Sequence, residues 1–321
     1  MSKYCPHCHC NTEVIKFGVT SSKRQRYRCK SCKHTWTNKP RPSKLSVAIW
    51  HDFVWNNMPI RALEAKYHKC GNTLRSIINQ YQPPRLDLAR LPEATKQQIK
   101  VVIMDTTYFG RNHGIVTFVD AHINRLLYFQ EINRSEITQD YIDGLEAIRA
   151  AGINPLACVV DGRRGLINTM EYRGLYVQVC LFHIQLMVRR YLTNTPILEP
   201  NKELKTVAEL LCHKKIKLDR FHFASILHGF FVRNERWLNE RTRLENGKYE
   251  FTHQDTRKAY QAIQKHFPWL FTYEKHPELN IPRTSNMIEG KFGNAKDKLK
   301  LHHGYTKELK TKIFFSLLSG E

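Results

Sequence analysis

The sequence predicts an α/β protein whose core contains a β-sheet. Two short apolar runs, at residues 101–105 and 157–161, end in Asp105 and Asp161. Continuous apolar runs of this length that contain β-branched residues are typical of fully buried strands. A carboxylate at the end of such a strand contributes little to packing, but it is well placed to bind a metal ion. We therefore expect both runs to be strands that carry a functional site.

The elements around these runs follow an order that is known from one fold. They are expected at residues 113–120 (strand), 126–131 (strand), 138–151 (helix), 168–173 (short helix) and 176–181 (strand). Together with the two apolar runs they give three antiparallel strands, a helix, a strand, a helix and a strand. This is the order of a ribonuclease H-like domain. The first and fourth strands are neighbours in that fold, so Asp105 and Asp161 would meet at one edge of the sheet.

The composition favours a protein that binds nucleic acid and disfavours a membrane protein. The chain has 321 residues, a net charge of +22 and 41% hydrophobic residues. No apolar run approaches the roughly 20 residues that span a bilayer. The start lacks the apolar segment of a signal peptide, so we expect a cytoplasmic protein that is nucleoid-associated when bound to DNA. A basic protein without a polyanionic partner is the alternative, which the local clustering of the charges disfavours.

Residues 1–44 are predicted to form a zinc ribbon. Two CxxC knuckles supply four thiolates, Cys5, Cys8, Cys29 and Cys32. Two such turns complete a tetrahedral sulfur site for a structural Zn²⁺ ion. A lone CxxC would also suit a redox dithiol, but two at this spacing favour zinc. A unit this small has little core, so the metal would supply most of its folding free energy. Spare donors nearby are His7, His9, Cys10 and His34.

Basic side chains gather at the tip of the expected ribbon. They are Lys23, Arg24, Arg26, Arg28, Lys30 and Lys33. Glu13 is the single acid among residues 1–45. A solvated run of charges is the simpler interpretation, but a metal-held unit would give these charges a fixed direction. We therefore expect them to contact the DNA backbone.

Residues 45–84 are predicted to form a helix-turn-helix domain. Apolar side chains recur at helical spacing in three stripes, which are Val47, Trp50 and Val54, then Ile60, Leu63 and Tyr67, then Leu74, Ile77, Ile78 and Tyr81. Gly71 lies in the second turn, and Asn72 or Thr73 is expected to cap the third helix. From a recognition helix in the major groove, Arg75 and Asn79 would reach phosphates or base edges. A plain three-helix packing unit is the alternative. Residues 85–99 are expected to be a linker with a short helix.

A third carboxylate usually completes a two-metal site, and Glu289 is the candidate. It lies near the start of an expected helix in residues 283–321, beside an apolar stripe. Four lysines follow it and are expected to face DNA, namely Lys291, Lys296, Lys298 and Lys300. The spacing Asn286-x-x-Glu289 also resembles a capping box, which would give the glutamate a structural role. Asp120, after the second strand, ranks behind Asp105 for the first position.

Two groups of polar side chains receive a structural interpretation. Cys180 and His183, at the end of the fifth strand, could be half of a metal site. No second knuckle lies nearby in the sequence, so zinc is not expected there. Asp140, Asp143 and Glu146 lie on the helix expected at residues 138–151, and we expect their carboxylates to be solvated.

Residues 100–318 resemble the Mutator-like superfamily of DDE transposases, which includes many bacterial insertion-sequence enzymes. The resemblance is carried by Asp105, by Asp161 followed by Cys180-x-x-His183, and by the distant Asn286-x-x-Glu289. It implies that a ribonuclease H-like core, residues 100–187 and 283–321, is interrupted by an all-helical insertion at residues 188–282. It also implies that Cys180, His183 and Asn286 support the active site and do not hold zinc. Arg236-Trp237 resembles a pair found in the family, although a core tryptophan is the commoner explanation.

The resemblance also implies a reaction and a set of partners. Asp105, Asp161 and Glu289 would bind two Mg²⁺ ions, or Mn²⁺ in their place, and one DNA strand would be cleaved at the end of the element. The freed 3′-hydroxyl would then attack another phosphodiester. The partners would be double-stranded DNA, as terminal inverted repeats and as target, and a second copy of the chain in a homodimer or larger assembly. The chain is shorter than many members of the superfamily, and a zinc ribbon is not universal among them.

Two other functions stay open at the level of sequence. A non-catalytic zinc-ribbon DNA-binding regulator would explain residues 1–82 and the positive charge, but not the spacing of the acids. A ribonuclease H-like nuclease would share the metal site but would not join strands. Mg²⁺-dependent nicking separates the first from a transposase, and a strand-transfer product separates the second.

Overall fold

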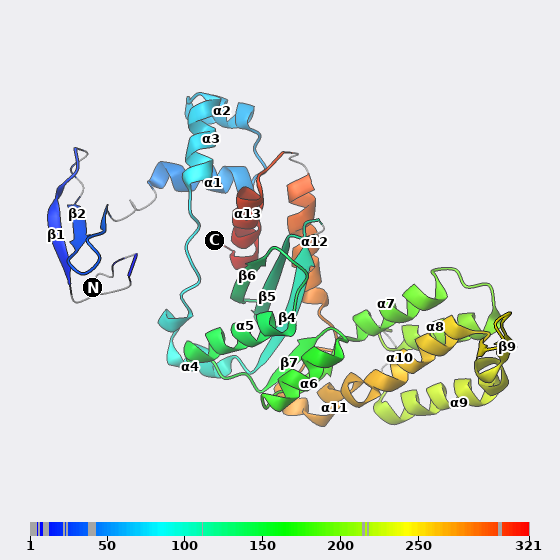
Figure 1. Ribbon diagram of the computed structural model, residues 1–321. Coiled ribbons are helices and arrows are strands. Elements are labelled where there is room, and N and C mark those ends of the chain that lie inside the picture. Colours follow the sequence, from blue (N-terminus) through cyan, green and yellow to red (C-terminus); the bar gives the residue numbers. More distant parts are fainter. Residues whose placement is uncertain are drawn as a thin grey trace. The chain divides into compact units, whose positions relative to one another are not determined.

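The computed structural model describes residues 5, 7–8, 13–21, 23, 25–37, 43–110, 112–213, 216, 218–300 and 304–320. The chain divides into two compact units, Met1–Gln82 and Pro83–Glu321 (Figure 1). None of the described helices is both long enough and apolar enough to cross a membrane.

The first unit begins with a small antiparallel sheet. Its strands are β1 (Val14–Val19), β2 (Gln25–Cys29) and β3 (Thr35–Thr37), in the order β1-β2-β3. Tyr27 in β2 is paired with Trp36 in β3, and their ring centroids lie 6.0 Å apart. Tyr27, Cys5 and Cys29 are buried. The interior of this small sheet is therefore built largely from sulfur atoms and one aromatic ring.

Three helices form the rest of the first unit. They are α1 (Lys44–Val54), α2 (Ile60–Tyr67) and α3 (Gly71–Gln80). Their buried side chains are Ile49, Trp50, Phe53, Val54, Leu63, Leu74, Ile78 and Tyr81. Val47 is 44% exposed, so the first stripe is wrong at that position. The buried face of α1 instead follows Ile49, Trp50 and Phe53.

The third helix starts two residues earlier than a cap at Asn72 would give. Cys70 is the N-cap of α3 and Gly71 is its first residue, so Asn72 and Thr73 lie inside the first turn. A Cβ atom at Gly71 would lie 2.8 Å from the Glu64 carboxylate in α2. The missing side chain of Gly71 thus allows α2 and α3 to pack closely. The turn itself is made by His68, whose left-handed backbone (φ 50°) ends α2.

The second unit is built on a five-stranded mixed sheet. Its strands are β4 (Val101–Tyr108), β5 (Gly114–Asp120), β6 (Leu126–Ile132), β7 (Ala157–Val160) and β8 (Tyr176–Val179), in the order β6-β5-β4-β7-β8. β4, β5 and β6 form an antiparallel meander, whereas β7 is parallel to both β4 and β8. The two apolar runs are therefore adjacent parallel strands. The short helix α4 (Glu93–Gln98) precedes this sheet.

Helices cover both faces of the sheet. They are α5 (Thr138–Ala150), α6 (Arg164–Tyr172), α12 (Asn286–Lys300) and α13 (Lys307–Ser319). Phe118 in β5 contacts both Tyr128 in β6 and Tyr141 in α5, while Phe129, the next residue of β6, packs on Phe315 in α13. Successive residues of a strand face opposite sides of a sheet. The helix α5 and the C-terminal helix α13 therefore cover opposite faces (Figure 1).

Two boundaries in the second half of the core differ from the expected ones. The helix α6 begins at Arg164 and not at residue 168, and β8 ends at Val179. The Cys180 amide still donates to Val160 O in the sheet (2.9 Å), but the Leu181 amide donates to Arg283 O (3.0 Å). The chain leaves the sheet at this point and enters α7 (Leu181–Leu192).

The insertion is not all-helical, contrary to the expectation. It contains α8 (Glu199–Leu210), α9 (Arg220–Asn239), α10 (Gln254–Leu270) and α11 (Thr272–Lys275). Between α9 and α10 lies a two-stranded antiparallel sheet of β9 (Arg241–Arg243) and β10 (Tyr249–Phe251). Asn246-Gly247 makes the turn, because Gly247 adopts a φ of +77° and donates to Leu244 O (2.9 Å). Near this hairpin, Trp237 stacks on His253 with 3.3 Å between ring centroids.

One acidic side chain on α5 is not solvated as expected. Asp140 is buried, and its two oxygens accept bonds of 2.7 Å each from the guanidinium of Arg134. It also accepts a bond from the Ile137 amide at the start of the helix (2.9 Å). The Arg134 guanidinium lowers the pKa of Asp140. Helical spacing predicted that this carboxylate faces solvent, but the guanidinium of Arg134 in the preceding loop covers it.

Candidate active site and metal centres

Asp105 and Asp161 reach the same edge of the sheet because of the register between β4 and β7. Ile103 is the partner of Val159 in this parallel pair. Each aspartate lies two residues after its member of the pair, so the two side chains leave neighbouring strands on the same face. The Thr106 amide donates to Asp105 Oδ1 (2.8 Å), and the Arg163 amide donates to Asp161 Oδ1 (3.2 Å). Local backbone bonds therefore orient both carboxylates.

The electrostatic environment of Asp105 is that of a crowded acidic site. Burial raises the pKa of Asp105 to about 7, and the nearby negative charges of Glu289 and Asp161 add to this rise. The positive charge of His183 and the bond from the Thr106 amide work in the opposite direction. These four groups are thus close enough to influence one another. A divalent cation bound here would relieve the repulsion among the acids.

Glu289 lies in the first turn of α12 and is held there by Ser285. The Ser285 hydroxyl donates to Glu289 Oε1 (2.6 Å), and the Ser285 amide donates to Cys180 Sγ (3.2 Å). The Ser285 hydroxyl also lies 3.2 Å from the same sulfur atom. Asn286 is exposed, and the contact expected of it is made by Ser285. Sequence reasoning missed this serine, although it stands four residues before the glutamate.

Cys180 and His183 lie at the start of α7, beside Glu289. Cys180 is fully buried and is the N-cap of the helix, and His183 is in its first turn. His183 Nδ1 lies 3.8 Å from Glu289 Oε1. Burial disfavours the imidazolium, but Cys180, Asp105 and Glu289 together raise the pKa of His183 to about 9. This histidine therefore carries a positive charge among the acids at neutral pH.

An arginine that sequence reasoning missed adjoins Asp161. Arg163 Nε lies 3.5 Å from Asp161 Oδ2, and Arg163 Nη1 lies 3.3 Å from Glu136 Oε1. Glu136 in turn accepts a bond from the Tyr141 hydroxyl (2.8 Å), which lies 2.9 Å from the Thr106 hydroxyl. This chain of contacts leads from one aspartate strand to the other. The sequence signal was the position of Arg163, two residues after the second aspartate.

Asp120, the weaker candidate for the first position, lies at the far end of the pair β4–β5. Its strand partner is Val102, whereas the partner of Asp105 is Thr117. Asp120 is buried, and its Oδ1 accepts bonds from the amides of His122 (2.8 Å) and Ile123 (3.4 Å). This carboxylate closes the turn between β5 and β6 and has no part in the acidic site.

The four expected zinc ligands come together in the first unit. Cys5, Cys8, Cys29 and Cys32 are free thiols whose sulfur atoms all lie within 4.8 Å of one another. The Cys5–Cys32 and Cys8–Cys29 sulfur pairs are each separated by 3.5 Å. Thiolates around one Zn²⁺ ion lie about 3.8 Å apart, since Zn–S bonds are about 2.3 Å long. The backbone of Cys32 lowers the pKa of Cys29 to about 6, which favours the thiolate. The donor set therefore fits zinc.

Comparison with known proteins gives a distant structural likeness. No family model matches the sequence, and no curated protein matches it. Among solved structures, the chain is similar to the Drosophila P element transposase strand transfer complex, with 11% sequence identity and a TM-score of 0.41. The match covers 90% of this chain and 94% of that chain. At this distance, function has to be inferred from the chain's own residues and geometry.

The four lysines of α12 were expected to face outward, but not all of them do. Lys291 Nζ donates to Asn124 O (2.7 Å) in the turn between β5 and β6, and burial lowers the pKa of Lys291. Lys300 pairs with Asp297 (2.9 Å). Lys296 is half-buried, and burial lowers its pKa while Asp105 acts in the opposite direction. Lys291 thus fastens the helix to the sheet, and the charge of Lys296 is coupled to that of Asp105.

Most of the described residues of the first unit that are expected to contact DNA are exposed. Lys23 and Arg26 are exposed, and Arg28 is half-buried with its guanidinium 5.0 Å from the centroid of the Phe17 ring. Arg24 lies outside the described residues. On α3, Arg75 and Asn79 are both exposed, and Arg75 donates to Asn72 Oδ1 (3.3 Å).

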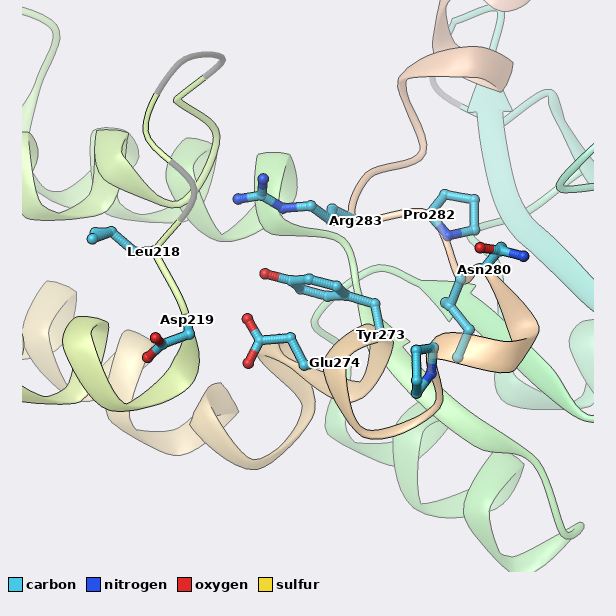
Figure 2. Close-up of a pocket in the computed structure, with 9 residues that line it drawn as sticks. Leu218, Asp219, Tyr273, Glu274, Asn280, Pro282 and Arg283 are labelled. Atoms are coloured by element: carbon cyan, nitrogen blue, oxygen red, sulfur yellow. The ribbon is translucent and has the colours of Figure 1, made fainter.

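A cavity of about 650 Å³ lies between the insertion and the approach to α12 (Figure 2), and its lining does not include Asp105, Asp161 or Glu289. Asp219, Tyr273, Glu274 and Arg283 line it. Asp219 Oδ1 accepts the amides of Phe221 and His222, while Glu274 Oε2 accepts the Arg220 amide (3.1 Å). The acids of this cavity therefore close the N-terminus of α9.

Proposed function

We propose that the chain is a DNA transposase of the DDE type, related to the Mutator-like superfamily and encoded by a bacterial insertion sequence. It would bind the terminal inverted repeats of its element, cleave a DNA strand there and join the freed 3′-hydroxyl to another phosphodiester. The observation that carries this proposal is the equal offset of Asp105 and Asp161 from one register pair of adjacent parallel strands. A ribonuclease H-like core offers its carboxylates to metal ions at this edge.

Asp105, Asp161 and Glu289 are the residues that would hold Mg²⁺, with Mn²⁺ as a substitute. Carboxylate oxygens are the ligands that Mg²⁺ prefers. Burial raises the pKa of Asp105 and the charges of Glu289 and Asp161 add to the rise, and a bound cation would relieve that repulsion. The bound metal would supply activation of the attacking oxygen and stabilisation of the leaving oxygen. Glu289 stands beside this pair and not within ligand distance of both aspartates among the described residues. A small movement at the start of α12 is therefore part of the proposal.

The chain's own cations would position the DNA at this site. Arg163 pairs with Asp161 on one side, and its guanidinium would offer a positive charge to a DNA phosphate beside that carboxylate. The imidazolium of His183 offsets part of the acidic charge when no metal is bound. The net charge of +22 would attract the DNA backbone as a whole. The predicted zinc ribbon and the three helices of the first unit would recognise the ends of the element. Pairing of two ends calls for a dimer or a larger assembly.

The first prediction tests the acids with a matched pair of variants. Asp161→Asn should abolish cleavage and joining of an oligonucleotide that carries the inverted repeat flanking the gene. Binding of that oligonucleotide should change less than about threefold, because the metal site contributes little of the backbone contact. Asp143→Asn is the control, since Asp143 is exposed on α5 and accepts a bond from Gln139.

Gel assays of cleavage, strand joining and binding in Mg²⁺ separate the proposed function from its rivals. Joined products in the wild type support a transposase, whereas cleavage without joining indicates a nuclease. Binding without cleavage indicates a regulator. Joining that survives in Asp161→Asn removes Asp161 from the site.

A further inference from the structure

Cys180, His183 and Glu289 form a compact group that the proposed chemistry uses only in part. Their ligand atoms all lie within 4.8 Å of one another. Across the described residues, the ribbon cysteines are the other group with this property. The members come from the starts of α7 and α12, two segments that the Leu181–Arg283 backbone bond joins (3.0 Å). The sequence offered no third ligand near Cys180 and His183, but the fold supplies one from over a hundred residues away.

The chemistry of this group is that of a zinc site with one open position. A thiolate, an imidazole and a carboxylate are the three ligand types that Zn²⁺ takes, and three protein ligands leave a fourth place for water. Mg²⁺ prefers oxygen ligands alone, so the buried thiol of Cys180 selects against it. Within the described part of the chain, His183 Nδ1 is buried and makes no hydrogen bond. This nitrogen lies 3.8 Å from Glu289 Oε1, which leaves both atoms close enough to bind one ion.

Ser285 provides the outer support that metal ligands need. Its amide donates to Cys180 Sγ (3.2 Å), and its hydroxyl donates to Glu289 Oε1 (2.6 Å). Ser285 is itself buried, so both bonds are shielded from water. Hydrogen bonds from a second layer of residues fix the orientation of metal ligands and strengthen binding. One serine here orients two of the three ligands.

We propose that Cys180, His183 and Glu289 bind a second Zn²⁺ ion, distinct from the structural zinc of the ribbon. This proposal is independent of the proposed strand-transfer activity, because it rests only on the distances among the three ligand atoms. Zinc at this place would hold the start of α12 against the start of α7. It would also retain Glu289 away from Asp105 and Asp161, so zinc would oppose Mg²⁺-dependent cleavage.

The second prediction concerns the number of zinc ions that the full chain binds. Titration of the metal-free protein against a chromophoric zinc chelator should give two equivalents per chain in the wild type. Cys180→Ser and Glu289→Gln should each give one, because a hydroxyl and an amide are poor zinc ligands. Ser285→Ala should keep both ions but weaken the second by about 10–100-fold.

Two control variants exclude adventitious binding. His222 is an exposed histidine paired with Asp219 (2.6 Å), and Cys70 is an exposed cysteine at the start of α3. His222→Ala and Cys70→Ser should both retain two equivalents. One equivalent of zinc per chain in the wild type overturns the proposal. Two equivalents in Cys180→Ser overturn it as well. In either case the group is a hydrogen-bonded ion pair. Retention of the ribbon zinc and a cooperative unfolding transition show that a variant is folded, and none of these readouts involves DNA.

Discussion

At the scale of single residues, Asp105 shows how burial and like charges act together. Asp105 lies within β4, where its carboxyl group is largely desolvated and close to two other acids. Both effects disfavour the charged form, so its pKa rises to about 7. A group in this state is partly protonated at neutral pH and releases its proton when a cation binds. Metal affinity at this site should therefore increase as the pH rises through 7.

The third prediction follows from the same shift and concerns stability. The folded pKa of Asp105 lies above its ordinary value of 3.8, so the folded state retains a proton that the unfolded chain has lost. The stabilisation is complete below about pH 4 and is lost as the pH rises towards 7, by at most about 1.4 kcal/mol per pH unit. Without added metal ions, Asp105→Asn should therefore gain stability relative to the wild type across this range.

Denaturant unfolding of the two proteins between pH 4 and 6.5 measures this difference. The upper limit keeps the comparison below the range in which His183 loses its own contribution, between 6.5 and about 9. The control is Asp143→Asn, which should track the wild type. A constant difference between Asp105→Asn and the wild type would show that Asp105 has an ordinary pKa.

At the scale of elements, the contact between α5 and the sheet depends on one glycine. A Cβ atom at Gly144 would lie 2.7 Å from Phe118 Cζ and 2.9 Å from Tyr128 Cδ1. Both rings belong to the sheet below the helix, and neither is a flexible chain end. Gly144 therefore sets the distance at which α5 packs. That distance places Tyr141, a residue of this helix, against Glu136 and Arg163.

The fourth prediction is that Gly144→Ala destabilises the second unit. Overpacking of a tight contact costs about 1–3 kcal/mol, more than the gain in helix propensity from alanine, which is at most about 1 kcal/mol. Gly293→Ala is the matched control, because no atom lies within 4 Å of a Cβ there and the residue is in the middle of α12. It should stabilise by about 0.5–1 kcal/mol. Thermal unfolding of both variants tests this, and equal shifts would contradict the packing argument.

The sequence predicted those elements whose apolar pattern is strong and local. The two apolar runs became adjacent parallel strands, since β-branched residues without polar interruption leave few other choices. The hairpin of β9 and β10 was not predicted, because strands of three residues are too short to show an alternation of apolar and polar side chains. The burial of Asp140 was not predicted, because its partner Arg134 lies in the preceding loop and helical spacing does not reveal that contact. The contact between Ser285 and Glu289 lies within one short segment, but the link to Cys180 is set by tertiary packing.

At the scale of the whole molecule, positive charge is concentrated in the first unit. Met1–Gln82 holds 15 of the 51 Lys and Arg but only 3 of the 29 Asp and Glu, which gives it +12 of the net +22. In the second unit many cations are paired with acids, as Arg134 is with Asp140 and Lys202 with Glu199. Binding of a polyanion should therefore depend more on the first unit than on the second.

The fifth prediction uses the salt dependence of DNA binding to test this division. Each phosphate contact contributes about −0.9 to the slope of log K against log salt. Arg26→Ala removes an exposed cation of β2, so it should reduce the slope by about one contact for any duplex sequence. Lys202→Ala removes a cation that is already paired with Glu199 (2.6 Å), so its slope should equal that of the wild type. Fluorescence anisotropy between 50 and 200 mM salt, roughly the range in which such contacts are resolved, measures both slopes. Equal slopes for Arg26→Ala and the wild type would remove Arg26 from the interface.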